Sequence, residues 1–558
     1  MSDRPLISRR QLLIATATGA VAAACTRATP AAPSPTPEAP ATQAPATEAP
    51  EPAATEVPVE AVPPDVSNTN LEQIKRLADP KANLKGFHGP IISSVETITT
   101  FNDQMFDKKM EELTNVHVGW QAAADWGRQP LEMLMASGDI PDLIAGWYAI
   151  NSDYADFGQK GALAPLNDLI DSNQYLSMLL KDRPDVRAQL VAPDGNIYAY
   201  PAITDGMRQC EFGYYIRQDW LEEVGMPVPS TVDEWYGAMK AFRGKDPNRH
   251  PLAWLVEMTI WLWGVGYNYS TYGTNFYHAG KEVRLGPIQP EFRAALAFLN
   301  KLYKEEIIPQ DYLKIAQEGM GAERVMSAGI AGSGVCLNNH IEYVVKNDPK
   351  AKFAGMQPPL GPTGNRELLA NWFGLVYWTG TCIGARSKQK ELAAQYTDLY
   401  YSDSGNALYF WGVLGDTYIE ENGVRKFTDK VLKDPKMSSF EYQWTVISPT
   451  WLGGYWNKSD DWVALMAPET KKAVEEWSAK PWQSIQLPAL YWTEDEREIV
   501  NSVEPDLNTL VAENVAKFID GTSNLEADYQ AWQDQIKSLN VAGLTSVYQA
   551  SYDRFLAA

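Results

Sequence analysis

The chain has 558 residues, of which 45% are hydrophobic and 21% are charged, and its formal net charge is −22 at pH 7. This length is enough for two lobes or domains with sizeable cores. The acidic balance argues against nucleic acid as a partner, because phosphate binding needs a basic face and the sequence shows none.

The N-terminus has the three zones of an export signal. A basic start ends in two arginines followed by two leucines, an apolar run covers residues 12–24, and small residues precede Cys25. The apolar run is too short to span a bilayer. The arginine pair resembles a twin-arginine signal, which exports proteins that fold before they cross the membrane. We therefore expect residues 1–25 to be a signal peptide.

Residues 21–25 (VAAAC) resemble a lipobox, in which the cysteine thiol is acylated and becomes the mature N-terminus. The alternative is an ordinary Ala-x-Ala cleavage that leaves Cys25 as a free thiol. We favour lipidation of Cys25. The protein would then be extracytoplasmic and lipid-anchored to the cell membrane.

A segment of biased composition follows the signal. Residues 26–65 are almost wholly Ala, Pro, Thr, Glu and Ser. Such a segment offers too little apolar surface to offset the entropy of ordering, and its prolines keep it extended. We expect a disordered stalk at 26–65 and a folded body at 66–558.

Within the body, helical and strand-like stretches alternate, which predicts α/β layers. Apolar spacing, a capping box at Thr231 and Glu234, and a proline at a helix start are the signals used. In chain order we expect a helix near 106–113 and a strand at 116–118, a helix near 131–135 and a strand at 143–145, helices after Thr231 and from Pro290, and a helical tail from Leu507.

Residue patterns typical of catalysis or metal binding are lacking. The five histidines show no metal-ligand spacing, and residues 361–366 (GPTGNR) lack the Lys and Ser/Thr of a phosphate-binding loop. Residues 494–498 (EDERE) contain paired carboxylates of the kind that glycoside hydrolysis needs. We favour a solvated helix start there, because acids gather at helix N-termini. The sequence predicts no catalytic residue, no cofactor and no metal.

The scattered cysteines Cys210, Cys336 and Cys382 imply no disulfide framework. One bridge among them is the alternative to buried thiols, which we favour.

Tryptophan is abundant, with 19 residues, several of them in polar or glycine-bearing stretches. An indole buries the flat C–H face of a pyranose ring with little loss of entropy, so sugar sites favour exposed aromatic residues. Packing in a core is the alternative for each tryptophan. The pattern favours a carbohydrate ligand.

Several segments of the body match, in order, the segments of one known family. They are residues 135–143 (MASGDIPDL), 194–201 (DGNIYAYP), 214–221 (YYIRQDWL), 410–423 (FWGVLGDTYIEENG) and the tail at 517–555. Through them the chain resembles extracellular solute-binding proteins of family 1, the receptor subunits of ABC importers. It resembles especially the long lipoproteins of that family that capture oligosaccharides. The resemblance runs from about Thr97 to the C-terminus.

The resemblance implies a two-lobed α/β fold of the periplasmic-binding-protein type, with a hinge, an interlobe cleft and a helical C-terminal tail. Lobe 1 would comprise about 90–200 plus about 370–415, and lobe 2 about 205–365 plus the C-terminal helices. A ligand would stabilise the closed state, which a permease reads. The expected partners are an oligosaccharide, the transmembrane subunits of an ABC permease, and the membrane through the lipid anchor. We expect a monomer without enzymatic activity.

Family position also implies which residues line the cleft. The aromatic side chains would stack on sugar rings, and the arginine would bond hydroxyl or carboxylate groups. The expected ligand-binding residues are Trp126, Trp147, Tyr148, Tyr214, Arg217, Trp261, Trp263, Tyr267, Trp372 and Trp411.

One stretch departs from relatives that bind alginate, some of which carry an acidic calcium loop after the capped helix. Here residues 245–251 (KDPNRHP) place Arg249 and Pro251 where acids would be needed. Other functions stay open: a surface lipoprotein that degrades polysaccharide, a receptor for a solute other than a sugar, and a signalling or adhesion module without an importer.

Overall fold

The computed structural model describes residues 71–91, 93, 95–125, 128–146, 151–204, 212–253, 256–268, 274–318, 321–367, 375–449, 453–479 and 484–557. The chain divides into two units, Met1–Pro63 and Pro64–Ala558, and every described residue belongs to the second unit. The expected signal peptide, Cys25 and the expected stalk lie outside the described residues. Within the described ranges, no helix is both long and apolar enough to cross a membrane.

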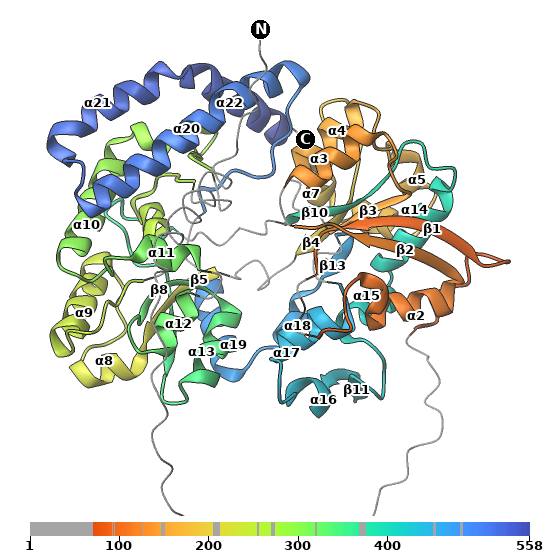
Figure 1. Cartoon of the computed structure of the whole chain (residues 1–558), viewed down its shortest axis with the longest axis horizontal. Coiled ribbons are helices and arrows are strands. Elements are labelled where there is room, and N and C mark those ends of the chain that lie inside the picture. The colour runs from red at the N-terminus through yellow and green to blue at the C-terminus, as the bar shows by residue number, and fades with distance from the viewer. Residues whose placement is uncertain are drawn as a thin grey trace, which may run out of the picture. The chain divides into compact units, whose positions relative to one another are not determined.

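The first lobe is built on a six-stranded sheet with the order β13-β4-β10-β3-β1-β2 (Figure 1). Strand β1 runs parallel to β2 and β3, whereas β10 runs antiparallel to β3 and β4. The strands are β1 (Ala82–His88), β2 (Val116–Ala122), β3 (Leu143–Ala145), β4 (Tyr200–Thr204), β10 (Val376–Ile383) and β13 (Tyr455–Asn457).

Helices accompany this sheet, and the expected α/β alternation is present. The helices and strands expected near 106–118 and 131–145 are confirmed as α2, β2, α3 and β3. The helices of this lobe include α2 (Met105–Thr114), α3 (Arg128–Ser137), α4 (Asn151–Gln159), α5 (Asn167–Asp171), α6 (Tyr175–Asp182), α7 (Pro184–Ala188), α14 (Lys390–Asp398), α15 (Asp403–Trp411), α16 (Asp429–Leu432), α17 (Ser439–Tyr442) and α18 (Ser459–Val463).

The main hydrophobic cluster of this lobe joins residues that lie far apart in the chain. It includes Leu71 and Leu465, which lie beyond the ranges expected from sequence for lobe 1. The reason is that the hairpin β11 (Tyr418–Glu421) and β12 (Val424–Phe427) and the helices after it place Phe427, Phe440 and Trp462 in the same core.

The second lobe contains a three-stranded sheet in which β5 (Phe212–Arg217) lies between β8 (Ser333–Leu337) and β9 (Phe353–Met356), antiparallel to both. Its other elements include α8 (Gln218–Val224), α9 (Val232–Lys245), the 3₁₀ helix η4 (Val256–Trp263), β6 (Phe276–Ala279), β7 (Glu282–Leu285), α10 (Pro290–Lys304), α11 (Tyr312–Gln317), α12 (Gly321–Ser327), α13 (Asn338–Asn347), α19 (Pro468–Ser478), α20 (Glu494–Asp520), α21 (Leu525–Ser538) and α22 (Val541–Ala557).

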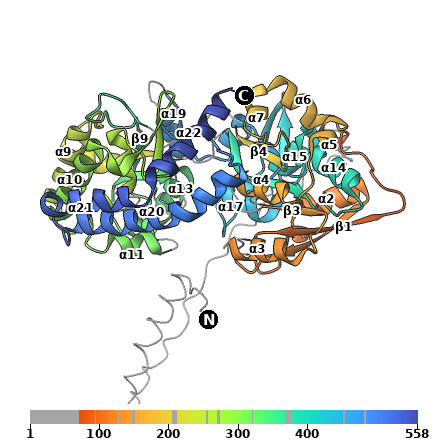
Figure 2. The same ribbon diagram turned by 90° about the horizontal axis from the view of Figure 1, so that it is seen from above.

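Local signals explain where several of these helices begin. The capping box expected at Thr231 and Glu234 is present at the start of α9, and Pro290 occupies the first turn of α10. A second capping box, Thr493 with Glu496, opens α20, so the 494–498 cluster is a helix start, as expected. Helices α20 and α21 lie along α10 (Figure 2), which completes the expected helical tail.

The chain passes between the lobes after β4, before β10 and after β13. The first two connections, residues 205–211 and 368–374, lie outside the described residues. After β13 the chain continues through α18 to Met466, which packs against the clusters of both lobes, and then enters α19. Trp477 of α19 packs directly on β5, because a Cβ at Gly213 would lie only 1.8 Å from its ring.

Cys336 and Cys382 are buried free thiols, one in each lobe, so the alternative of a disulfide between these two is wrong. Burial raises the pKa of both thiols. Cys210 lies outside the described residues.

Candidate functional site

Three parallel strands of the first lobe end at one edge of the sheet. His88 at the end of β1 is in register with Ala122 of β2 and with Ala145 of β3. Ligands of α/β sheets bind beyond the carboxyl ends of the strands. The segments that leave β2 and β3 at this edge lead to three of the expected ligand-binding residues. These are Trp126, Trp147 and Tyr148, which lie outside the described residues.

His88 is a buried polar residue at this edge that sequence reasoning did not single out. Its ring stacks on Phe101, with ring centroids 3.6 Å apart, and Nδ1 donates to the carbonyl of Gly89. Nε2 is therefore an acceptor, and it has no partner among the described residues. Burial lowers the pKa of His88 to about 4, so the ring is neutral at physiological pH. An isolated histidine carries no sequence signal that separates this position from an ordinary core residue.

Of the expected residues in the second lobe, Tyr214 is buried in β5. Its ring meets Trp235 edge-on, with ring centroids 5.9 Å apart. Its hydroxyl group is buried and has no hydrogen-bond partner in the part of the chain that the structure describes. Tyr214 therefore brings an unsatisfied polar group to the first strand after the connection from β4.

Arg217, at the end of the same strand, already has partners within its lobe. Its guanidinium group pairs with Asp219 at 2.6 Å and with Asp348 at 3.5 Å. The group also lies 4.9 Å from the ring centroid of Trp220, and only 4% of the side chain is exposed. The structure gives Arg217 a packing and pairing role, and its contact with a ligand stays a prediction.

Four more of the expected aromatic residues are buried in the cores. Trp261 donates through Nε1 to the carbonyl of Tyr267 at 3.2 Å, and Trp263 packs beside Phe298. In the first lobe, Trp411 stacks on Phe427 and donates through Nε1 to Asp461 at 2.8 Å. Trp261, Trp263, Tyr267 and Trp411 are at most 5% exposed. Such side chains offer little free surface for stacking, so their ligand contacts stay predictions. Trp372 lies outside the described residues.

The stretch at 245–251 contains a positively charged side chain, that of Arg249. The Arg249 guanidinium lies 4.2 Å from the ring centroid of Trp220 and bonds Glu223 at 2.7 Å. Asp246 caps the turn by accepting from the backbone and side-chain nitrogens of Asn248, at 2.9 and 3.0 Å. The positive charge of Arg249 repels a calcium ion. The acids Glu223 and Asp246 already accept bonds from Arg249 and Asn248. These residues therefore do not fit calcium.

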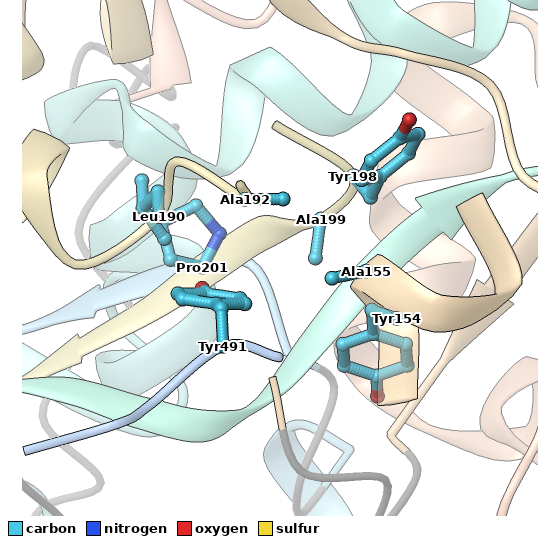
Figure 3. Close-up of a pocket in the computed structure, with 8 residues that line it drawn as sticks. All are labelled: Tyr154, Ala155, Leu190, Ala192, Tyr198, Ala199, Pro201 and Tyr491. Carbon is cyan, nitrogen blue, oxygen red and sulfur yellow. The ribbon is translucent and has the colours of Figure 1, made fainter. Parts of the chain in front are cut away.

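A short extended segment of the tail, residues 489–493, joins the lobes by packing; we call it the strap. Leu490 and Trp492 belong to the core of the second lobe, whereas Tyr491 packs against a cluster of the first lobe. Figure 3 shows the Tyr491 ring in a pocket of the first lobe, lined also by Tyr154, Ala155, Leu190, Ala192, Tyr198, Ala199 and Pro201. The Tyr491 hydroxyl donates to the carbonyl of Gln189 at 2.8 Å.

The strap is held from both sides. Ser551 of α22 accepts from the backbone nitrogen of Tyr491 and donates to its carbonyl, which Arg554 also bonds. One helical turn into α20, Arg497 lies 3.5 Å from Asp153 and 4.0 Å from Asp156, both on α4 of the first lobe. The helical tail packs in the second lobe and is thus also bonded to the first lobe. Sequence reasoning missed this contact.

Comparisons with known proteins agree with this architecture. The family described as bacterial extracellular solute-binding protein matches residues 96–407. The chain belongs to this family. As a member of the bacterial extracellular solute-binding proteins it is a receptor-type protein, and the resemblance inferred from sequence is confirmed.

Among curated relatives of this solute-binding protein is the fructooligosaccharide ABC transporter substrate-binding protein FusA of Streptococcus pneumoniae. It is 20% identical over 489 residues, which cover 82% of this chain and 88% of FusA. The polygalacturonan/rhamnogalacturonan-binding protein YtcQ of Bacillus subtilis is 21% identical over 324 residues, covering 56% of this chain and 63% of YtcQ.

Solved structures of the family confirm the two-lobed α/β fold with its helical C-terminal region. The alginate-binding protein AlgQ2, solved without calcium ion, superposes with a TM-score of 0.70 and 25% identity, covering 86% of this chain and 99% of AlgQ2. FusA in complex with kestose superposes with a TM-score of 0.69 and 18% identity, covering 85% of this chain and 99% of FusA.

Proposed function

We propose that the chain is the substrate-binding subunit of an ABC importer and captures an oligosaccharide between its lobes. The observation that carries the proposal is the near full-length similarity to AlgQ2 and FusA, whose names state an alginate and a fructooligosaccharide ligand. The alignment of strand ends in the first lobe supports it, because this edge leads into the segments with Trp126, Trp147 and Tyr148. Closure around the sugar would be the signal that the permease subunits read.

We further propose that the protein acts outside the cytoplasm as a monomer, anchored through acylated Cys25. The composition of residues 26–65 supports a stalk between this anchor and the folded body. Such a tether would keep a receptor near its permease while its cleft samples the medium.

Titration calorimetry of the mature chain against a panel of glycans tests the ligand class. The panel comprises kestose, an alginate oligosaccharide, a rhamnogalacturonan oligosaccharide and a human milk oligosaccharide, with a peptide and a polyamine as controls. We expect at least one sugar to bind with a Kd near 1 μM, or about −8 kcal/mol. That sugar, at 100 times its Kd, should stabilise the protein by about 2.7 kcal/mol in a thermal melt.

Two outcomes would contradict the proposal. Binding of the peptide or polyamine, with silence across all sugars, would assign another solute class. Release of shortened products from any panel glycan would instead identify an enzyme that acts on polysaccharide.

A further inference from the structure

Two neighbouring polar groups of the second lobe are buried without hydrogen-bond partners within the described ranges. Glu367 is 3% exposed and its Oε2 has no partner, and Tyr214 is 1% exposed and its hydroxyl has none. The two are close enough for Glu367 to influence the pKa of Tyr214, which burial raises well above its usual range. An unpaired buried acceptor beside an unpaired buried donor is an arrangement that native proteins rarely leave unfilled.

Two other buried carboxyl groups of the described residues have structural partners. Glu342 accepts from the backbone nitrogen of Ala467 at 2.8 Å, and Asp107 accepts from the Trp120 indole at 2.8 Å. The neighbouring cation, Arg366, is engaged elsewhere, because its guanidinium donates to Ser230 and Pro358. Glu257 of η4 resembles Glu367, because its buried Oε2 also has no partner among the described residues. What distinguishes Glu367 is therefore its position.

The position of the pair adds a reason to expect a ligand. Tyr214 is the third residue of β5, which the chain enters directly from the β4 connection. Glu367 immediately precedes residues 368–374, the other connection, which carries Trp372. Both groups thus lie where the chain passes between the lobes, and in a two-lobed receptor the ligand lies at that junction. The β5 backbone is already paired with β8 and β9, so only the Tyr214 hydroxyl is left to bond.

We propose that Glu367 and Tyr214 form a hydroxyl-binding pair in the second lobe: the carboxylate accepts from sugar hydroxyls, and the phenol donates to a sugar oxygen. A neutral sugar supplies the missing donors without a counter-ion. This inference rests on the proposed capture of an oligosaccharide and names residues for it.

The pair predicts a proton-linked affinity. Burial raises the pKa of Glu367 to about 7, and Tyr214 is the titratable group that the described residues place in electrostatic contact with it. Hydroxyl donors stabilise the ionised form, so binding should lower this pKa and release protons near neutral pH. Affinity should then rise about tenfold from pH 6 to pH 8, because the free protein loses its proton over that range.

The test is calorimetry of the full mature chain with kestose and the alginate oligosaccharide, in buffers of different ionisation enthalpy at pH 6, 7 and 8. We expect proton release from the wild type at pH 7. Glu367→Gln should abolish this release and weaken binding at pH 8 at least tenfold, and Tyr214→Phe should weaken binding and retain the release. Glu342→Gln, a buried carboxyl of the same lobe with a structural partner, should change affinity less than twofold.

The outcomes separate the two proposals. If the wild type binds either sugar without proton release, and both variants bind as tightly as wild type, the pair has no role and sugar capture stands. If the wild type binds neither probe nor any other panel sugar, the proposed function fails. The proton measurement on the wild type needs no variant to fold, and melting temperatures of the variants identify any that do not.

Discussion

The hydrogen bonds of the indole nitrogens show that several tryptophans of this chain have structural roles in the core. Trp120 donates to Asp107, Trp411 to Asp461, and Trp261 to a backbone carbonyl. A sequence shows that a tryptophan is present, but it does not show whether the fold places a buried hydrogen-bond acceptor next to the indole N–H. The ligand role predicted for Trp261 and Trp411 therefore competes with a packing role that only the fold reveals.

At this scale Asp107 gives a clear pH prediction. Burial raises the pKa of Asp107 to about 7, against about 3.9 in an unfolded chain. Between these values the folded state keeps a proton that the unfolded state has lost, so this group's contribution to stability falls as pH rises through 7. Asparagine cannot ionise and keeps the acceptor oxygen for Trp120. We expect Asp107→Asn to be more stable relative to wild type at pH 8 than at pH 5, by a few kcal/mol.

Urea unfolding at pH 5 and pH 8 measures this difference in the free energy of unfolding. The exposed Asp182→Asn variant in α6 serves as the control and should show no such difference. Equal effects of Asp107→Asn at the two pH values would mean that Asp107 stays ionised in the folded protein.

Glu367 and His88 mark the limit of residue-level prediction. Neither belongs to a motif, and each acquires its unpartnered atom only when distant elements bury it. By contrast, the strands before the segments with Trp126 and Trp147 were predictable, because local apolar spacing indicates β2 and a family motif leads into β3.

Among the elements, helices with capping boxes were predictable because their signals are local. Thr231 with Glu234 is an example, since four consecutive residues contain the whole capping box. The strap has no such signal. Its apolar residues have neither helical spacing nor alternation with polar ones. The pair that supports it, Arg497 of α20 with Asp153 of α4, joins positions 344 apart.

The strap leads to a prediction about the contact between lobes. Arg497→Met would remove the cation that lies beside the buried Asp153 carboxylate, so we expect a loss of about 3 kcal/mol. Tyr491→Phe keeps the ring but loses the bond to Gln189, which should cost about 1 kcal/mol. Both variants should also speed amide hydrogen exchange at residues 189–198.

Calorimetric melting and exchange mass spectrometry provide these measurements. The control is Arg293→Met, which removes an exposed pair with Glu526 and should stay within about 0.5 kcal/mol of wild type. If Arg497→Met melts like Arg293→Met, the tail does not contribute to the interlobe contact.

For the whole molecule, the two-lobed α/β class followed from sequence, whereas the set of distant segments that share a core did not. Leu71 and Leu465 belong to one cluster although most of the first lobe and all of β5 to β9 lie between them in the chain. Hydrophobic periodicity describes single elements and cannot show which distant elements share a core.

Anchoring is a property of the whole exported chain and has its own test. We expect mass spectrometry of the membrane-extracted protein to show an N-terminal Cys25 carrying acyl chains. Cys25→Ser should release the protein into the medium or the soluble exported fraction, with its affinity for sugar unchanged. A mature N-terminus with an unmodified thiol would remove the tether and leave the binding proposal standing.

The alternating contacts of the strap also restrict evolution and engineering of the tail. Leu490 and Trp492 face one core and Tyr491 the other, so side-chain direction changes with every residue. Deleting one residue within the strap would reverse this alternation and direct the side chains that precede the deletion toward the wrong lobe. Length changes here should therefore be tolerated only in pairs, unlike changes in an ordinary surface loop.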